Sequence, residues 1–361
     1  MQRIHKLVHG FSSYGEKDVP DSEMTAAGHY GLQHGVKEID VAPHYRKGKQ
    51  EHLLGSMKST LHEKQAEQLK ISTKVGIVIE EKDEKEDRGF KRSDKKSRRF
   101  DYTVTGIETS FEQSKHRLDV SKVHAIYVHD LDKDTHGDNY EEMQDDFFKR
   151  GGYAALQNLK TTGKTDKIGL GSNDASTCLE LIKRDDFKID RILLAGSFDL
   201  IHTDLLKTEF FKICRDKKIE IYLAAPFCSG ILAGTKIYKY GEANDAVLKK
   251  VAAIQAVCDE HHVKLAHAAV QFVCLHPQVK GVAVGLRTVK EMRDSLYYAK
   301  TPIEQKFWLA LKEKGLIPQN APTDPIVLCS TSINHFKPQL QTGMQDKSKV
   351  LITEAPSRSR L

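Results

Sequence analysis

Short apolar runs alternate with segments of helical periodicity along most of the chain. Apolar runs of this length, bounded by turn residues, are typical of buried strands. The runs that predict strands span residues 4–8, 38–41, 69–75, 123–128, 167–172, 191–194, 220–224 and 279–284. The segments that predict helices span residues 22–34, 50–61, 105–118, 147–159, 177–183, 205–214, 244–261 and 266–275. A polar insert is expected at 131–145.

About eight strands, each followed by a helix or a long loop, predict the α/β class and a single-domain (β/α)8 TIM barrel over residues 1–320. A doubly wound sheet is the alternative, but no GxGxxG motif opens its first strand–helix turn. Periodicity is lost from Ala321 onward, so residues 321–361 are expected to form a disordered tail.

Charge changes this picture only locally. The chain has 361 residues and a net charge of +6, and its charge concentrates in residues 80–99, where an acidic run precedes a basic one. Phe90 is the single aromatic residue of the basic run, which therefore lacks a stacking platform for bases. We expect a solvated, mobile loop there and no nucleic-acid partner.

The apolar runs are too short for a membrane-spanning helix, so no membrane partner is expected. The six cysteines form no CxxC pair, and the seventeen histidines form no HExxH motif. We interpret the cysteines as reduced core residues and expect no metal.

Four residues at predicted strand ends carry the candidate chemistry: Asp40, Tyr45, Lys74 and His129. An ionisable group at the carboxyl end of a buried barrel strand is often placed there for catalysis. An ammonium stabilises the phenolate of a nearby tyrosine, and a carboxylate would keep that ammonium charged and oriented. An imidazole beside them could donate to, or orient, a reacting oxygen. The set predicts a proton-transfer site.

Several motifs in order along the chain resemble the aldo-keto reductases, and within them the D-threo-aldose 1-dehydrogenases and L-galactose dehydrogenases. The motifs span residues 40–45, 72–76, 100–102, 110–114, 128–130, 168–173, 193–196, 227–232, 302–308 and 315–317. The resemblance implies a barrel oxidoreductase that uses NAD(P), with a catalytic quartet of Asp40, Tyr45, Lys74 and His129.

The resemblance also implies three groups of cofactor-binding residues. The pair that would hold the nicotinamide carboxamide is Ser172 and Asn173, although a simple turn after a strand would look the same. The loop that would wrap the pyrophosphate contains Phe227, Ser229 and Gly230. The residues that would hold the adenosine part are Gly285, Leu286, Arg287, Glu291, Asp294 and Ser295. An ordinary helix start capped by Thr288 is the alternative for this last stretch.

The same stretch favours NAD over NADP. Gly285 and Glu291 stand where members that prefer a 2′-phosphate often carry Lys and Arg, and a carboxylate would repel that phosphate. Arg287 and Arg293 favour the opposite choice. We expect NAD, with NADP as the alternative.

The expected activity is oxidation of an aldose at C1 to its lactone. Two alternatives remain: NADPH-dependent reduction of an aldehyde or ketone, such as a pyridoxal-like compound, and a cofactor-binding regulatory subunit. The chain ends in Ser359-Arg360-Leu361, a variant of the Ser-Lys-Leu peroxisomal address. We therefore expect a peroxisomal import receptor as a partner and a peroxisomal location, or otherwise a cytoplasmic one.

Overall fold

The structure is a computed structural model that describes residues 6–12, 19–81, 96–239 and 241–324. The centre of the charged segment, most of the predicted tail and the final tripeptide lie outside these residues. The predictions made for them, including the peroxisomal address, stay predictions.

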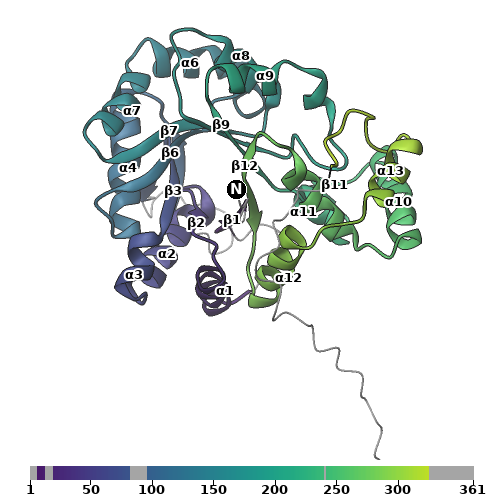
Figure 1. The fold of residues 1–361 in the computed structure, drawn as a ribbon. Coiled ribbons are helices and arrows are strands. Elements are labelled where there is room, and N and C mark those ends of the chain that lie inside the picture. The colour runs from purple at the N-terminus through teal and green to yellow at the C-terminus, as the bar shows by residue number, and fades with distance from the viewer. Residues whose placement is uncertain (1–5, 13–18, 82–95, 240, 325–361) are drawn as a thin grey trace, which may run out of the picture. The chain divides into compact units, whose positions relative to one another are not determined.

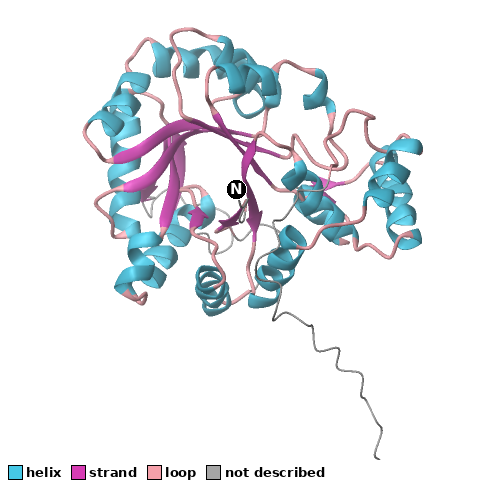
Figure 2. Ribbon diagram, viewed as in Figure 1, coloured by secondary structure: helices cyan, strands magenta, loops and turns pink. Residues whose placement is uncertain are grey.

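Eight parallel strands close into a barrel, as the alternation of apolar runs predicts. Around the ring the order is β1, β12, β9, β8, β7, β6, β3, β2, and Figure 2 shows these strands enclosed by helices. The strands are β1 (Leu7–Gly10), β2 (Glu38–Asp40), β3 (Lys70–Val75), β6 (Val123–His129), β7 (Thr165–Ser172), β8 (Arg191–Ala195), β9 (Glu220–Ala224) and β12 (Val279–Gly285).

Helices follow the strands in sequence and pack around the barrel (Figure 1). The α-helices are α1 (Asp21–Gln33), α2 (Lys49–Ser59), α3 (Glu63–Gln68), α4 (Val104–Leu118), α5 (Lys133–His136), α6 (Tyr140–Phe148), α7 (Gly152–Thr161), α8 (Ala175–Lys183), α9 (Phe210–Asp216), α10 (Asp245–Glu260), α11 (Leu265–Leu275), α12 (Val289–Lys300) and α13 (Gln305–Glu313). Short 3-10 helices are η1 (Tyr45–Gly48), η3 (Gly137–Asn139), η4 (Asp204–Lys207) and η5 (Cys228–Ala233).

The N-terminal end of the barrel carries a partly buried ion cluster around Arg191. The guanidinium of Arg191 donates to Glu38 at 2.6 Å and to Glu220 at 2.8 Å, and it lies 4.4 Å from the ring centroid of Tyr222. Arg191, Glu220 and Glu38 are the first residues of β8, β9 and β2. In parallel barrels, residues at the N-terminal ends of the strands mainly stabilise the fold, and catalytic residues lie at the C-terminal ends.

Two helix predictions were wrong, and the polar insert contains short helices. The helix predicted at 147–159 is broken between α6 and α7, where Gly151 has a φ of +89° and a Cβ on Gly152 would lie 1.8 Å from the carbonyl oxygen of Tyr102. The polar insert at 131–145 contains α5, η3 and the start of α6. Residues 205–214 divide into η4 and α9.

The charged segment differs from a plain loop. Its flanks are strands β4 (Ile77–Glu81) and β5 (Lys96–Phe100), which pair antiparallel as a separate two-stranded sheet. The expected start of the tail is also too early, because Ala321 and Thr323 are buried.

None of the helices formed by the described residues combines the length and the apolarity that a bilayer crossing requires. The five cysteines in the described ranges are free and buried, as predicted: Cys178, Cys214, Cys228, Cys258 and Cys274.

Candidate functional site

The barrel brings the four predicted catalytic residues to one arc of its C-terminal rim. Strands β2, β3 and β6 are neighbours, and they supply Asp40, Lys74 and His129 at or near their last positions. Tyr45 begins η1, five residues after Asp40. Because parallel strands end at the same edge, residues far apart in sequence converge there.

Asp40 and Lys74 form a buried ion pair. The Lys74 ammonium lies 2.7 Å from the Asp40 carboxylate, with side chains 3% and 6% exposed. The same ammonium donates to the carbonyl oxygen of Val41 at 2.9 Å, and the Ser72 hydroxyl donates to the other Asp40 oxygen at 2.8 Å. These contacts hold the ammonium in one place next to the phenol.

Tyr45 lies between Lys74 and His129. Its ring centroid is 5.0 Å from the Lys74 ammonium and 6.4 Å from the His129 ring, to which it is almost perpendicular. The ring of His44 closes the group, at 6.0 Å from His129 and 6.3 Å from Tyr45. A phenol, an ammonium and an imidazole within this space suit proton transfer at one oxygen.

His129 is neutral in this environment. Burial, followed by the positive charges of Lys74 and Arg98 and the nearby His44, lowers the pKa of His129 well below its usual range. Its buried Nδ1 has no hydrogen-bond partner among the described residues. A neutral imidazole can donate an N–H to a substrate oxygen but brings no positive charge of its own.

Three residues near the quartet were not identified from the sequence. Arg98, on β5, donates to the Nε2 of His44 at 2.8 Å. Burial, then the charges of Arg98 and Lys74, lowers the pKa of His44 to about 4. Arg98 was missed because the run of charges around it predicted a solvated, mobile loop and not a strand beside the site.

Asp130 is the third of these residues. Its carboxylate lies 3.5 Å from Nε2 of His129, and its φ of +52° is left-handed. Burial, then the neighbouring Asp132, raises the pKa of Asp130 to about 7. Its place directly after a strand-end histidine was a signal that could have identified it.

The residues predicted for the nicotinamide end follow β7. The Ser172 hydroxyl donates to Asp132 at 2.5 Å and accepts from the backbone N–H of Asp174 at 2.9 Å, so it also shapes the turn. Asn173 is exposed, and its backbone carbonyl oxygen accepts from the Ser197 hydroxyl at 2.9 Å.

The residues predicted for the pyrophosphate lie in the loop after β9, which we call the cofactor loop (residues 225–235). Cys228, Ser229 and Gly230 have left-handed φ values of 48°, 62° and 116°. A Cβ on Gly230 would lie 2.6 Å from the Thr235 hydroxyl. The surrounding residues therefore hold this backbone in a strained conformation, as is common in ligand-binding loops. Phe227 is half-buried against the core.

The adenosine residues lie where β12 turns into α12. Thr288 caps the helix by accepting from the backbone N–H of Glu291 at 3.1 Å, which is the helix start described above as the alternative for this stretch. The Glu291 carboxylate accepts from the Arg287 backbone N–H at 2.7 Å and from its guanidinium at 2.8 Å. Leu286 is buried and Gly285 is exposed.

Later in α12, Asp294 pairs with Lys290 at 2.6 Å and Ser295 is only 2% exposed. A nicotinamide dinucleotide fits the rim in two respects. In the described part of the chain, the buried Nδ1 of His129 lacks a hydrogen-bond partner, and a Cβ on Gly285 would have only Ser12 within 4 Å.

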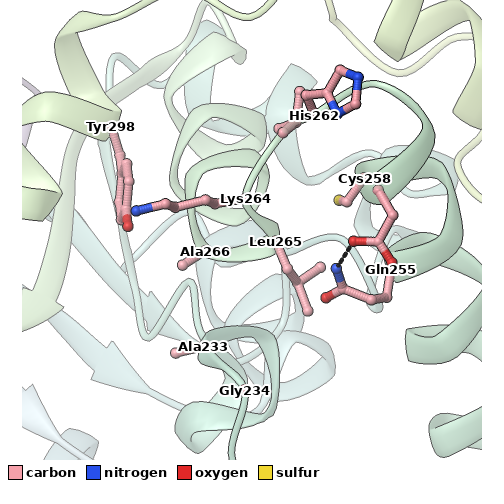
Figure 3. Close-up of a pocket in the computed structure, with 11 residues that line it drawn as sticks. Ala233, Gly234, Gln255, Cys258, His262, Lys264, Leu265, Ala266 and Tyr298 are labelled. Carbon is pink, nitrogen blue, oxygen red and sulfur yellow. Dashed lines mark hydrogen bonds between the residues drawn. The ribbon is translucent and has the colours of Figure 1, made fainter. Parts of the chain in front are cut away.

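A separate cavity of about 530 Å³ lies between α10, α11 and α12. Its lining includes Ala233 and Gly234, at the end of the cofactor loop, and Tyr298 of α12. Figure 3 shows Lys264 extending toward Tyr298 on one side and Gln255 bonded to Asp259 on the other. The cavity lies beside two segments predicted to bind the cofactor, but no residue of the quartet lines it.

A closed parallel barrel with a buried Lys–Asp pair, a tyrosine and a neutral histidine at its C-terminal rim defines a barrel enzyme built for proton transfer. The sequence profile of the aldo/keto reductase family matches residues 6–315. The chain belongs to this family and is an oxidoreductase of the aldo-keto reductase type, as its motifs predicted. The family uses nicotinamide cofactors.

Two relatives and one solved structure show the range of similarity. The chain is 32% identical to the pyridoxal 4-dehydrogenase of Microbacterium luteolum, over 80% of this chain and 86% of the relative. It is 28% identical to the D-threo-aldose 1-dehydrogenase of a Pseudomonas species, over 87% and 95%. It shares its fold with the aldo-keto reductase AKR11C1 of Bacillus halodurans (holo form), with a TM-score of 0.64, 17% identity, and coverage of 85% of this chain and 91% of that one.

Proposed function

We propose that this protein uses NAD⁺ to oxidise the C1 hydroxyl of a cyclic aldose to the corresponding lactone. The observation that carries the proposal is the buried Lys74–Asp40 pair, which places a fixed positive charge 5.0 Å from the ring of Tyr45. A fixed ammonium stabilises the phenolate that must accept a proton from the substrate hydroxyl. Both relatives described above carry the name dehydrogenase, which favours the oxidative direction.

Each residue of the quartet has a distinct role in this reaction. Tyr45 accepts the proton of the C1 hydroxyl, and Lys74 stabilises the resulting phenolate. Asp40 holds Lys74 in place, and neutral His129 donates an N–H to the reacting oxygen. NAD⁺, when bound, supplies the hydride acceptor.

We infer NAD rather than NADP from the turn before α12. Glu291 places a carboxylate at this turn and engages the Arg287 guanidinium at 2.8 Å. A 2′-phosphate placed here would be repelled by Glu291 and would compete with it for Arg287, whereas a ribose diol would not.

A pyridoxal-like substrate is the second candidate, favoured by the relative at 32% identity. Pyridoxal carries an aldehyde next to a hydroxymethyl group, so it can close to a hemiacetal as an aldose does. Removal of hydride from the hemiacetal carbon would again give a lactone. The two candidates therefore use the same proton-transfer site and differ in the shape of the ring that the pocket accepts.

The test is a spectrophotometric screen of the full chain with NAD⁺ and with NADP⁺. Its substrates are L-galactose, L-fucose, D-arabinose and pyridoxal, and lactone formation is confirmed by trapping with hydroxylamine. We expect NADH from at least one aldose, and a Tyr45→Phe variant should lose about 10²–10⁴-fold in kcat with unchanged NAD⁺ affinity. Tyr297→Phe, at a tyrosine 51% exposed on α12, is the matched control.

Turnover of pyridoxal alone would replace the sugar by the second candidate. Reduction of generic aldehydes with NADPH that far exceeds any oxidation would overturn the proposed direction. A complete lack of hydride transfer with any substrate would instead favour a regulatory subunit.

A further inference from the structure

Three side chains with metal-binding atoms converge between two loops at the C-terminal rim. Asp199 and His202 lie in the loop after β8, and Cys228 lies in the cofactor loop after β9. One carboxylate oxygen, one ring nitrogen and the sulfur all lie within 4.8 Å of one another. The pattern was invisible in the sequence, where these residues match no known ligand spacing.

The spacing of the atoms is close to that of a zinc site. Nδ1 of His202 lies 3.0 Å from Oδ2 of Asp199 and 4.0 Å from Sγ of Cys228. Tetrahedral zinc, with bonds of about 2.0–2.3 Å, separates neighbouring nitrogen and oxygen ligands by about 3.4 Å and nitrogen and sulfur ligands by about 3.6 Å. Shifts of a few tenths of an ångström would bring His202 to the spacing that zinc requires with each of its two neighbours. The Asp199 oxygen and the Cys228 sulfur lie within 4.8 Å of each other, so they would have to approach by up to about 1 Å.

The ligands are also held in orientation by their neighbours. Oδ1 of Asp199 accepts from the backbone N–H groups of Ile201 and His202, at 2.7 and 2.9 Å. Nε2 of His202 hydrogen-bonds the hydroxyl of Tyr238 at 2.8 Å. A second hydrogen bond on the far ring nitrogen is the arrangement that orients histidine ligands in metal sites.

Charge gives an independent reason to expect a cation. The Asp199 side chain is 1% exposed, and in the described ranges its only partner within ion-pair distance is His202. A buried carboxylate with no lysine or arginine in direct contact is costly. Lys250 lies nearby and donates to the carbonyl oxygen of Ile201 at 2.6 Å, so it offsets the charge of Asp199 only at longer range. Asp199 and a Cys228 thiolate would together neutralise a divalent cation, and His202, 21% exposed, leaves a route for the ion and for a water as fourth ligand.

We propose that Asp199, His202 and Cys228 bind one divalent cation of the zinc class, and that the bound ion fastens the cofactor loop to the loop after β8. Nitrogen, oxygen and sulfur ligands select zinc, cobalt or cadmium over magnesium or calcium. His202 already contacts both Asp199 and Cys228, so binding an ion would require side-chain shifts of no more than about 1 Å.

The test measures metal binding to the full chain without cofactor or substrate, so its result is independent of the proposed oxidoreductase activity. Zinc is titrated in competition with a chromophoric chelator, and cobalt is added to look for the absorption of a thiolate–cobalt bond. We expect one tight equivalent of zinc and a thiolate–cobalt band. Cys228→Ser should abolish the band and weaken zinc binding at least tenfold.

Cys258→Ser, at a buried cysteine of α10, is the matched control and should change neither signal. His202→Gln alters a partly exposed residue and should also weaken binding at least tenfold, which guards against misfolding of a buried variant. Tyr238→Phe should weaken it about 10–100-fold through the lost hydrogen bond. A lack of tight zinc binding, or a band that persists in Cys228→Ser, would overturn the proposal.

Discussion

Replacing Asp40 by asparagine should leave the Lys74 ammonium buried without its counter-charge. The pair is 2.7 Å long and at most 6% exposed, so solvent can compensate little. Loss of one partner of such a pair costs about 3–5 kcal/mol of the free energy of unfolding. The carbonyl oxygen of Val41 still accepts from Lys74, and Ser72 can still donate to the asparagine oxygen, so the lost interaction is mainly the charge.

A double-mutant cycle separates the charge interaction from other effects of substitution. Lys74→Met should also lower the free energy of unfolding by about 3–5 kcal/mol, because it leaves the buried Asp40 carboxylate without its counter-charge. The double variant leaves no buried charge, so its cost should be smaller than the sum by about 2 kcal/mol or more. Urea unfolding of the four proteins, followed by circular dichroism, measures this coupling energy.

The exposed pair Lys290–Asp294, with side chains 76% and 33% exposed, provides the comparison. Its coupling energy should not exceed about 0.5 kcal/mol. A coupling for Asp40 and Lys74 as small as that of the surface pair would refute the view that burial makes the catalytic pair interdependent.

Three further predictions concern other parts of the molecule. Glu291→Gln removes a negative charge from the first turn of α12, so the ratio of kcat/KM for NADP⁺ to that for NAD⁺ should rise at least tenfold. An unchanged ratio would contradict the proposed preference for NAD. Burial raises the pKa of Asp130 from 3.8 to about 7, so the folded protein favours the protonated form. The contribution of this proton to the free energy of unfolding is complete below about pH 4 and is lost as the pH rises to about 7. Asp130→Asn should flatten the loss of Tm between pH 4 and pH 8, and a variant as pH-sensitive as the parent protein would contradict this. Gly152→Ala would place a Cβ 1.8 Å from the carbonyl oxygen of Tyr102 and should cost at least about 3 kcal/mol in urea unfolding, whereas Gly241→Ala, with its nearest contact at 3.9 Å, should cost much less.

The strands and the quartet were predictable because their signals are local. Asp40 and His129 each end a short apolar run, and Lys74 stands one residue before the end of another, so counting strands was enough to place them on one rim. The break at Gly151 was not predictable from periodicity. It depends on the close approach of Gly152 to the carbonyl group of Tyr102, about fifty residues earlier in the chain.

The charged groups around the quartet were missed for the same reason. Arg98 contacts His44, which lies 54 positions earlier in the sequence. Because the sequence does not reveal this partner, the charges around Arg98 predicted only a solvated loop. The cluster of Asp199, His202 and Cys228 likewise depends on two loops meeting in space. Such contacts follow from how the barrel orders its strands and have no pattern along the chain.

The order of strands around the barrel also separates two tasks. The quartet comes from β2, β3 and β6 and the turn after β2, whereas the residues proposed for the cofactor follow β7, β9 and β12. The strands of the quartet are neighbours in the ring, and the cofactor residues lie on the arc from β7 to β12, in which β8 supplies none of them. No strand contributes to both sets. Substitutions that retune the choice of nucleotide can therefore accumulate on one arc without disturbing the proton-transfer chemistry of the other, so the two properties are free to diverge independently among descendants of this fold.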